Sequence, residues 1–259
     1  MKIVESVADL KAIRQCQGEG VSIGFVPTMG NLHAGHMELI RRSVAENSQT
    51  WVTVFVNPTQ FNQSEDFAAY PRTLAEDKRC LVDCGVDYLW LPEEKEMYAE
   101  PHYTLSEQLV SLVAEGEHRP GHFDGVLTIL LKLFSLLRPK RAYFGEKDYQ
   151  QLLLVQGMVK AFFLDVGIIA CPTVRNQQGL ALSSRNSRLS SSRQDFASAL
   201  SRILFSAASP QQARQMLLEK GFEVEYVVEK WGRRLAAVEI DGVRLIDNIK
   251  IEEKVHVNL

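Results

Sequence analysis

The amino-acid sequence predicts an α/β protein: a Rossmann-like parallel sheet with helices on both faces, plus a smaller C-terminal α+β domain. Through about residue 175, apolar runs of strand length alternate with segments of helical spacing. This alternation is typical of parallel strands joined by right-handed crossovers. After residue 175 the composition shifts, and two helical segments precede three short strand-like ones. We therefore expect two domains, 1–175 and 176–259.

Strands of the first domain are expected where short apolar runs end in a turn signal. Pro27, Pro58, Pro92 and Pro172 each follow such a run closely, and Gly145 closes another. The run at 50–56 is continuous and rich in β-branched and aromatic residues, as expected for a strand covered on both faces. In chain order, the expected strands are 21–26, 50–56, 87–91, 141–145 and 166–170.

Helices are expected where apolar residues recur at helical spacing, as Val7, Leu10 and Ile13 do. The segment 126–137 is almost entirely apolar and predicts a buried helix. In chain order, the expected helices are 7–18, 33–43, 74–84, 107–114, 126–137, 148–163, 194–207 and 210–220. Loops are expected at 59–65 and 115–122, and the serine- and arginine-rich stretch after residue 183 is expected to be flexible. The last expected strands are 223–229, 234–240 and 243–247.

Composition narrows the class of protein. The 259 residues are 46% hydrophobic and 24% charged, which is ordinary for a globular domain. The net charge of -3 argues against a nucleic-acid-binding surface. No apolar run approaches the roughly 20 residues of a membrane span, and the N-terminus lacks a signal-peptide core. The four cysteines form no C-x-x-C pair. We therefore expect a cytoplasmic protein without membrane or nucleic-acid partners.

The segment from Val21 to Arg42 carries the clearest functional signal. Its expected strand passes through a Thr-Met-Gly-Asn turn into a helix that begins near His33 and His36. Unpaired N–H groups and the positive end of the helix dipole converge there and favour a phosphate. The dinucleotide fingerprint and the P-loop motif are both absent. The His-x-Gly-His element is similar to that of class I nucleotidyl-transfer enzymes, which implies attack at an α-phosphate; the alternative is two polar residues in a turn.

Three later segments supply candidate partners for a phosphate and a hydroxy acid. Ser183-Ser184-Arg185 offers hydroxyls and a guanidinium to a polyphosphate. Lys147 follows a strand end, where open α/β sheets bind ligands, and would neutralise phosphate charge. Its neighbour Asp148 would either hold magnesium or cap a helix. Asn57 and Gln60 follow another strand end, and Gln60 would offer an amide to a hydroxy acid, although turn chemistry alone explains Asn57-Pro58.

Other polar residues are open to two interpretations. The loop from Arg119 to His122 is either a substrate-side lid or a structural turn. One of Gln150 and Gln151 is expected to face the site. The carboxylates of Asp66, Glu76 and Asp77 are expected mostly on solvated faces.

On these motifs the sequence resembles the pantothenate synthetase (pantoate–β-alanine ligase) family, whose members are class I nucleotidyltransferases. The resemblance covers most of the chain, with several long motifs in the family's order. These motifs are 27–36, 55–61, 70–73, 119–126, 144–152, 172–175, 179–186 and 244–248. Departures are Ala34, where many relatives have glutamate, the Asn176-Gln177-Gln178 stretch, and a C-terminal part shorter than expected.

The resemblance implies a two-step ligation. ATP and pantoate would first give an enzyme-bound pantoyl adenylate and pyrophosphate, and the amine of β-alanine would then release pantothenate and AMP. It also implies magnesium and a homodimer. The segment 183–188 is the candidate loop that closes over the adenylate, and whether the C-terminal lid domain itself closes stays open.

The resemblance assigns residues to these roles by position. The expected catalytic residues are His36 as proton donor, His33, Lys147 and Arg185. The expected substrate-binding residues are Gln60, Gln151, Met29 and Asn57. The expected ATP contacts are Met29, Gly30, His33, Gly35, His36, Gly145, Lys147, Asp148, Val174, Leu182, Ser183, Ser184 and Arg185. Asp77 and Asp148 are the candidate magnesium ligands.

Two other functions remain open at this point. One is a different adenylyl- or cytidylyltransferase on the same nucleotide scaffold, and the other is a non-catalytic nucleotide-binding module. Pyrophosphate release that depends on pantoate separates the first from the ligase, and ATP binding without AMP production favours the second.

Overall fold

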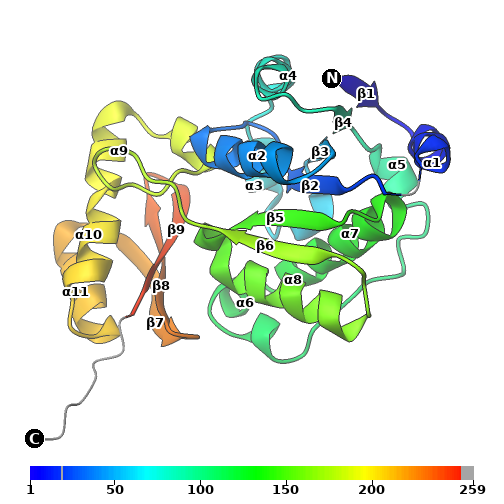
Figure 1. The fold of residues 1–259 in the computed structure, drawn as a ribbon. Helices are drawn as coiled ribbons and strands as arrows, with labels where there is room; N and C mark the ends of the chain where they lie inside the picture. The colour runs from blue at the N-terminus through cyan, green and yellow to red at the C-terminus, as the bar shows by residue number, and fades with distance from the viewer. Residues whose placement is uncertain (19, 252–259) are drawn as a thin grey trace, which may run out of the picture. The chain divides into compact units, whose positions relative to one another are not determined.

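The computed structural model describes residues 1–18 and 20–251. The chain divides into two compact units, Met1–Val174 and Arg175–Leu259. The N-terminal unit holds a six-stranded parallel sheet, and the C-terminal unit holds a three-stranded antiparallel sheet with helices (Figure 1). This architecture confirms the predicted fold class.

The parallel sheet has the strand order β1-β4-β3-β2-β5-β6. Its strands are β1 (Lys2–Val4), β2 (Ile23–Thr28), β3 (Gln49–Val54), β4 (Tyr88–Trp90), β5 (Arg141–Gly145) and β6 (Gly167–Cys171). The edge strand β1 was not predicted, because only Val4 among its three residues is buried and so short a run carries no period. Its position depends on pairing with β4, which is distant in sequence.

Helices cover both faces of this sheet. They are α1 (Val7–Cys16), α2 (Ala34–Glu46), α3 (Ser64–Ala68), α4 (Leu74–Asp83), α5 (Glu94–Met97), α6 (Glu115–His118), α7 (His122–Leu137) and α8 (Tyr149–Ala161). Three short 3₁₀ helices accompany them: η1 (Pro58–Gln60), η2 (Val110–Leu112) and η3 (Glu146–Asp148). Thus the segments expected to be loops at 59–65 and 115–122 contain short helical turns.

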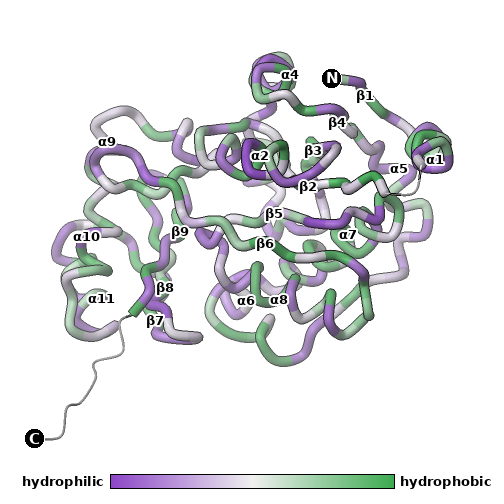
Figure 2. Tube along the Cα trace, viewed as in Figure 1, coloured by the Kyte–Doolittle hydropathy of each residue, from purple (hydrophilic) through white to green (hydrophobic). Residues whose placement is uncertain are grey.

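The core follows from the alternation of side chains along the central strands. Phe25 and Trp51 are fully buried on one face, against residues of α7 such as Leu127. Val26 and Val52 are fully buried on the other face, against α2 and α4. Successive strand residues point to opposite faces, so a continuous apolar run requires cover on both. Figure 2 shows the complementary pattern on α2 and α4, where hydrophilic residues interrupt hydrophobic ones.

The prediction of a helix over 107–114 is wrong. Only the 3₁₀ turn η2 forms there, and Leu109 and Leu112 are 76% and 59% exposed. The apolar residues of this segment therefore do not share a buried face, which an amphipathic helix requires.

The buried helix α7 begins at His122, four residues before the expected start, because Gly121 adopts a left-handed conformation (φ 80°) that leads into it.

The C-terminal unit contains η4 (Ser184–Arg188), α9 (Ser191–Ala197), α10 (Ala199–Ser206), α11 (Pro210–Lys220), β7 (Glu223–Lys230), β8 (Arg233–Ile240) and β9 (Val243–Lys250). The single helix predicted over 194–207 is two helices that meet at Ser198. The stretch expected to be flexible forms η4 and the start of α9, whose cap is the Ser190 hydroxyl. Both hairpins are as predicted, with Asp241 and Gly242 in the left-handed region that two-residue turns require.

Within residues 1–18 and 20–251, no helix has the length and apolar character needed to cross a membrane.

Candidate active site

The carboxyl ends of β2 and β5 lie at a topological switch point of the parallel sheet. From β2 the chain continues to β3 on one side, and from β5 it continues to β6 on the other. The β2–β5 ladder includes only Gly24 with Arg141 and Phe25 with Ala142. It ends before Pro27, which has no N–H to donate. Open α/β sheets bind ligands outside such a point, so the segments that leave β2 and β5 form the candidate site.

The turn that leaves β2 is held by side chains and needs a glycine. The Thr28 hydroxyl donates to the carbonyl of Thr53 (2.6 Å) and accepts from the N–H of Gly30 (3.2 Å). Gly30 has φ 80°, and a Cβ there would lie 2.9 Å from Val54 Cγ1. The backbone after β2 can therefore turn sharply toward α2 only with glycine at this position.

Asp77 fixes the same turn from α4. Its carboxylate accepts hydrogen bonds from the N–H groups of Asn31 (3.0 Å) and Leu32 (2.8 Å). The Thr73 hydroxyl donates to it at 3.3 Å, and Asp77 is only 2% exposed. The expectation of a solvated carboxylate was wrong. Because both oxygens already accept backbone hydrogen bonds, Asp77 fits the role of a turn anchor better than that of a magnesium ligand.

His33 and His36 form a capping box at the start of α2. His33 Nδ1 accepts from the Gly35 N–H at 3.1 Å, and His36 Nδ1 accepts from the His33 N–H at 3.3 Å. The two ring centroids lie 4.1 Å apart. Each Nδ1 acts as an acceptor, so each neutral ring carries its proton on Nε2. The helix N-terminus thus presents two side-chain N–H donors in addition to its backbone N–H groups.

Both rings are kept neutral at pH 7. Burial lowers the pKa of His33 to about 4, and the positive charge of Lys147 adds to this while Asp148 opposes it. Burial, followed by His33 and Lys147, brings the pKa of His36 well below its usual 6.5. Neutral imidazoles at this place would donate hydrogen bonds to a phosphate without requiring a buried positive charge.

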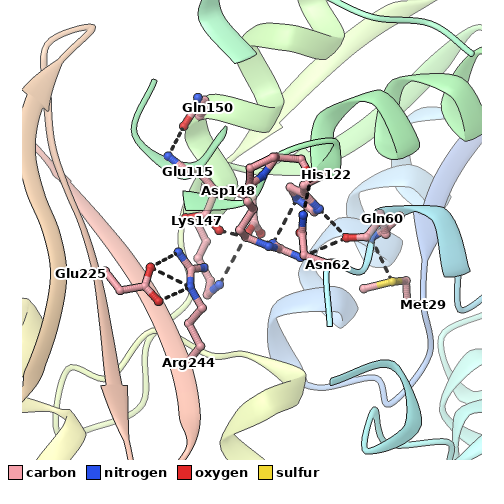
Figure 3. Close-up of polar contacts among 12 residues, drawn as sticks. Met29, Gln60, Asn62, Glu115, His122, Lys147, Asp148, Gln150, Glu225 and Arg244 are labelled. Carbon is pink, nitrogen blue, oxygen red and sulfur yellow. Dashed lines mark hydrogen bonds and ion pairs between the residues drawn. The ribbon is translucent and has the colours of Figure 1, made fainter. Parts of the chain in front are cut away.

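Beside this turn, Gln60, which follows β3, lies against Met29, which follows β2 (Figure 3). Gln60 Nε2 lies 3.1 Å from Met29 Sδ, and the Asn57 amide donates to Gln60 Oε1 at 3.0 Å. Asn57 is 1% exposed and also accepts from the Tyr98 hydroxyl at 2.5 Å. Gln60 therefore has a fixed orientation next to Met29, with Asn57 as its buried support.

The segment after β5 places a lysine and a carboxylate side by side. Lys147 Nζ lies 3.7 Å from Asp148 Oδ1, and the lysine side chain is 16% exposed. Asp148 occupies the position before α8, but its side chain makes no capping hydrogen bond. Gln150 is buried and bonded to backbone groups. Of the two glutamines, the half-buried Gln151 is therefore the one left to face a ligand.

The remaining candidate ATP-binding residues come after β6, the last strand of the parallel sheet, in the sequence. Val174 is the last residue of the N-terminal unit. Leu182 and Ser183 are half-buried in the C-terminal unit, and the Ser183 hydroxyl accepts from the Arg185 N–H at 3.3 Å, which starts η4. Ser184 is buried. The N-terminal unit brings together a set at the carboxyl edge of its sheet: Met29, Gly30, His33, Gly35, His36, Asn57, Gln60, Gly145, Lys147, Asp148 and Gln151.

Supporting residues escaped prediction because their contacts are long-range. Tyr98 reaches Asn57, 41 residues away, and no local pattern marks it.

Among the residues that the structure describes, no group of three or more histidine, cysteine, aspartate or glutamate side chains is placed to bind a metal ion. Mg²⁺ bound mainly by phosphate oxygens and water needs only one or two protein carboxylates, and Asp148 has the exposure for this, with a 47% exposed side chain.

Comparisons with known proteins identify the family of this chain. A pantoate-beta-alanine ligase family profile matches residues 2–250. A pantothenate synthetase of Legionella pneumophila (strain Lens) is 49% identical over 249 residues, 96% of this chain and 99% of the relative. The crystal structure of the Francisella tularensis pantoate-beta-alanine ligase, complexed with beta-gamma ATP and beta-alanine, superposes with a TM-score of 0.92 at 39% identity, covering 96% of this chain and 97% of that one.

A second crystal structure, that of the Thermus thermophilus pantothenate synthetase, gives a TM-score of 0.89 at 39% identity and covers 96% of this chain and 99% of that one. The family profile, the relative and both structures span nearly the whole sequence. The chain therefore belongs to the pantoate-beta-alanine ligase family.

Proposed function

We propose that this chain ligates pantoate to β-alanine at the expense of ATP, through an enzyme-bound pantoyl adenylate. Family membership and the Francisella complex with ATP and β-alanine support the substrates. The observation that carries the proposal is the pair of neutral histidines at the N-terminus of α2, beside the fixed amide of Gln60. A phosphate and a hydroxy acid would meet at this edge of the sheet.

In the first step, a carboxylate oxygen of pantoate attacks the α-phosphorus of ATP, and the bond to the β-phosphate oxygen breaks to release pyrophosphate. Attacker and target are both negative, so catalysis depends on orientation and charge neutralisation. The Nε2–H groups of His33 and His36 would donate to the α-phosphate oxygens. Lys147 would place its positive charge beside the phosphates, and no side chain needs to act as a nucleophile.

Pantoate would bind against Gln60 and Met29. The Gln60 amide, held by Asn57, would donate to and accept from its hydroxyl and carboxylate groups, and Met29 would contact its methyl groups. Gln151, on the first turn of α8, would contribute a second amide. In the second step the amine of β-alanine attacks the acyl carbon, the proton of the amine is lost, and AMP leaves as pantothenate forms.

The family resemblance assigns residues to the pyrophosphate end of ATP. We assign this role to Gly145, Lys147 and Asp148 after β5, to Val174, and to Leu182, Ser183, Ser184 and Arg185 around the start of η4. Arg185 suits a polyphosphate because guanidinium groups bind phosphate oxygens in pairs. Mg²⁺ would neutralise phosphate charge when bound with ATP, and Asp148 is its candidate protein ligand; Asp77 is not retained.

An isotope experiment tests the adenylate. With ¹⁸O in the pantoate carboxylate, attack at the α-phosphorus leaves one ¹⁸O in AMP, and mass spectrometry of the products detects it. Label in inorganic phosphate, together with ADP formation, would instead show attack at the γ-phosphorus and would overturn the adenylate. Unlabelled AMP with the label in pyrophosphate would show attack at the β-phosphorus, and unlabelled AMP with unlabelled pyrophosphate would show that the carboxylate does not attack ATP.

A coupled assay tests the substrates. AMP formation should require pantoate, β-alanine and ATP together, and pyrophosphate release should require pantoate but not β-alanine. Pyrophosphate release with a phosphorylated acceptor or a nucleotide in place of pantoate would favour a different nucleotidyltransferase.

From the family resemblance we also propose a homodimer, and light scattering of the purified chain measures this oligomeric state. From the cysteine pattern we propose a cytoplasmic location.

A further inference from the structure

Gln150 is a buried amide to which the proposed chemistry assigns no role. It lies in the first turn of α8, is 3% exposed, and precedes Gln151. Its Oε1 accepts from the Glu115 N–H at 3.0 Å, as Figure 3 shows, and its Nε2 donates to the carbonyls of Val110 (2.8 Å) and Val113 (2.7 Å). All three bonds go to backbone groups of one segment, 110–115, which runs from η2 through a turn at 113–114 to the first residue of α6.

This turn has a conformation that its own sequence does not favour. Ala114, 3% exposed, has φ 48° and ψ −115°, a sparsely populated region for any residue with a Cβ. At Gly116 a Cβ would lie 1.7 Å from the Ser111 carbonyl oxygen, so the two sides of the turn touch through backbone. A strained turn persists only when surrounding contacts fix it, and the Gln150 amide supplies three of them.

The same turn fixes a contact to Gln60. The Glu115 carboxylate, on a residue that is 5% exposed, pairs with Arg119 at 3.3 Å. Arg119 Nη2 donates to the backbone carbonyl of Gln60 at 3.1 Å. His122 Nδ1 lies 2.7 Å from the same carbonyl, and its Nε2 lies 3.1 Å from Arg119 Nη1. Since arginine only donates, His122 Nε2 accepts, and its Nδ1–H donates to Gln60.

The backbone around Gln60 has no freedom to relax. A Cβ at Gly125 of α7 would lie 2.4 Å from the Thr59 carbonyl oxygen and 2.8 Å from the Gln60 N. The helix therefore packs directly on η1, and the carbonyl of Gln60 is bound on the side that faces Arg119 and His122. A displacement of Arg119 would therefore distort a hydrogen bond that orients the Gln60 backbone, from which the amide side chain extends.

We infer that Gln150 is a positioning residue for the hydroxy acid: by fixing the turn before α6, it sets Glu115 and Arg119, and through them the Gln60 amide. The inference rests on the proposed function, since it takes Gln60 as a pantoate ligand. It links α8, which carries Gln151, to the segment after β3, and so sets the spacing of the two amides that would hold pantoate. Gln150 itself touches no substrate.

Steady-state kinetics of Gln150→Met test this role. Methionine keeps the size of the side chain and removes all three hydrogen bonds. We expect the KM for pantoate to rise about five- to tenfold, the effect of one misplaced hydrogen bond, with the KM for ATP unchanged within about twofold. The matched control is Gln156→Met, on the exposed side of the same helix, which should leave both constants unchanged.

A second variant keeps the test decisive if Gln150→Met fails to fold, as circular dichroism would show. Arg119→Lys retains the charge but loses the fork that reaches both Glu115 and Gln60, and should raise the same KM. Where both variants fold, the double variant should be no worse than the poorer single one, because both changes break one chain of contacts. Equal increases in the two KM values, or additive effects, would overturn the inference. A wild-type chain without pantoate-dependent AMP formation would instead overturn the proposed function.

Discussion

The ion pairs inside the N-terminal unit differ in kind from those inside the C-terminal unit. In the N-terminal unit, the described ion pairs join residues at most four apart along the chain, such as Arg41 with Glu38 and Arg42 with Glu46. In the C-terminal unit, they join residues up to 72 apart, and every one of them uses arginine. Within this set of pairs, the long-range ones therefore belong to the smaller unit.

Size explains the difference. The N-terminal unit is about twice as long and buries continuous apolar strands on both faces of its sheet. The C-terminal unit is shorter and has one apolar cluster between its helices and its three strands. Two of its ion pairs include a buried partner on the same strands, Asp247 with Arg175 and Arg234 with Glu229. Another of its pairs, Arg244 with Glu225 at 2.7 Å, is visible in Figure 3. The comparison teaches that loss of a buried long-range ion pair should disturb the smaller unit, whereas loss of an exposed short-range pair should leave the larger unit folded.

The largest effect on stability is expected from Asp247→Asn. Asp247 is buried and holds Arg175 through two hydrogen bonds of 2.6 and 2.9 Å. Its loss should lower the free energy of unfolding of the C-terminal unit by about 2–4 kcal/mol, somewhat below a fully buried pair because the Arg175 side chain is 26% exposed. Hydrogen exchange of the backbone amides of β8 and β9 measures it, because these amides report on the C-terminal unit alone.

The matched control for this change is Asp241→Asn, which breaks the exposed pair with Arg193. Asparagine tolerates the left-handed conformation of Asp241, so only the ion pair is lost. A shift as large as that of Asp247→Asn would contradict the distinction between buried and exposed pairs.

In the N-terminal unit, His36→Gln should damage the reaction and not the fold. Glutamine at this position keeps an acceptor for the capping box but removes the Nε2–H donor. We expect single-turnover pyrophosphate release to fall about 10²–10³-fold, equivalent to about 2.7–4 kcal/mol, the loss typical of one preorganised donor. Thermal unfolding should be nearly unchanged, and a normal rate would remove His36 from the mechanism.

The pH dependence of stability should carry the signature of His33. Its pKa falls from 6.5 to about 4 on folding, so between these values the unfolded chain binds more protons than the folded one. This contribution to stability is complete above pH 6.5 and is lost as the pH falls toward 4. Besides burial, Lys147 lowers and Asp148 raises the pKa of His33, whereas His33 and Lys147 lower that of His36.

The variant His33→Asn isolates this contribution, because asparagine also accepts at a helix N-cap. Urea unfolding at several values from pH 7 to 4.5 should show a shallower loss of stability in the variant than in the wild type. Parallel curves would show that His33 does not titrate in this window.

The smallest effect is expected from Arg41→Ala. Arg41 and Glu38 lie on the surface of α2 with side chains 60% and 56% exposed. Pairs of this kind contribute about 0.3–0.5 kcal/mol and are screened by salt. The urea midpoint of the N-terminal unit should therefore hardly move. A change comparable to that of Asp247→Asn would contradict the idea that the larger unit depends on apolar burial.

Much of the candidate site was accessible from the sequence because strand ends mark it. Gln60, Lys147 and the histidine pair each follow an apolar run, and the carboxyl ends of parallel strands meet at one edge of a sheet. The helix predicted over 107–114 failed because apolar spacing does not say which residues find a partner surface. Asp77 and Gln150 were misjudged or left open because their partners lie far away in the chain.

By itself, the sequence determined the alternation of strands and helices, the two hairpin turns of the C-terminal unit, and the His-x-Gly-His element at the start of α2. These are local properties, set by residue periodicity, by backbone conformations that few residues adopt, and by capping. Tertiary structure alone decided that Asp77 holds the turn after β2, that Gln150 holds the strained turn before α6, and that Arg175 reaches Asp247. A buried polar group takes whichever partner the folded chain brings within reach, and that choice leaves no local pattern.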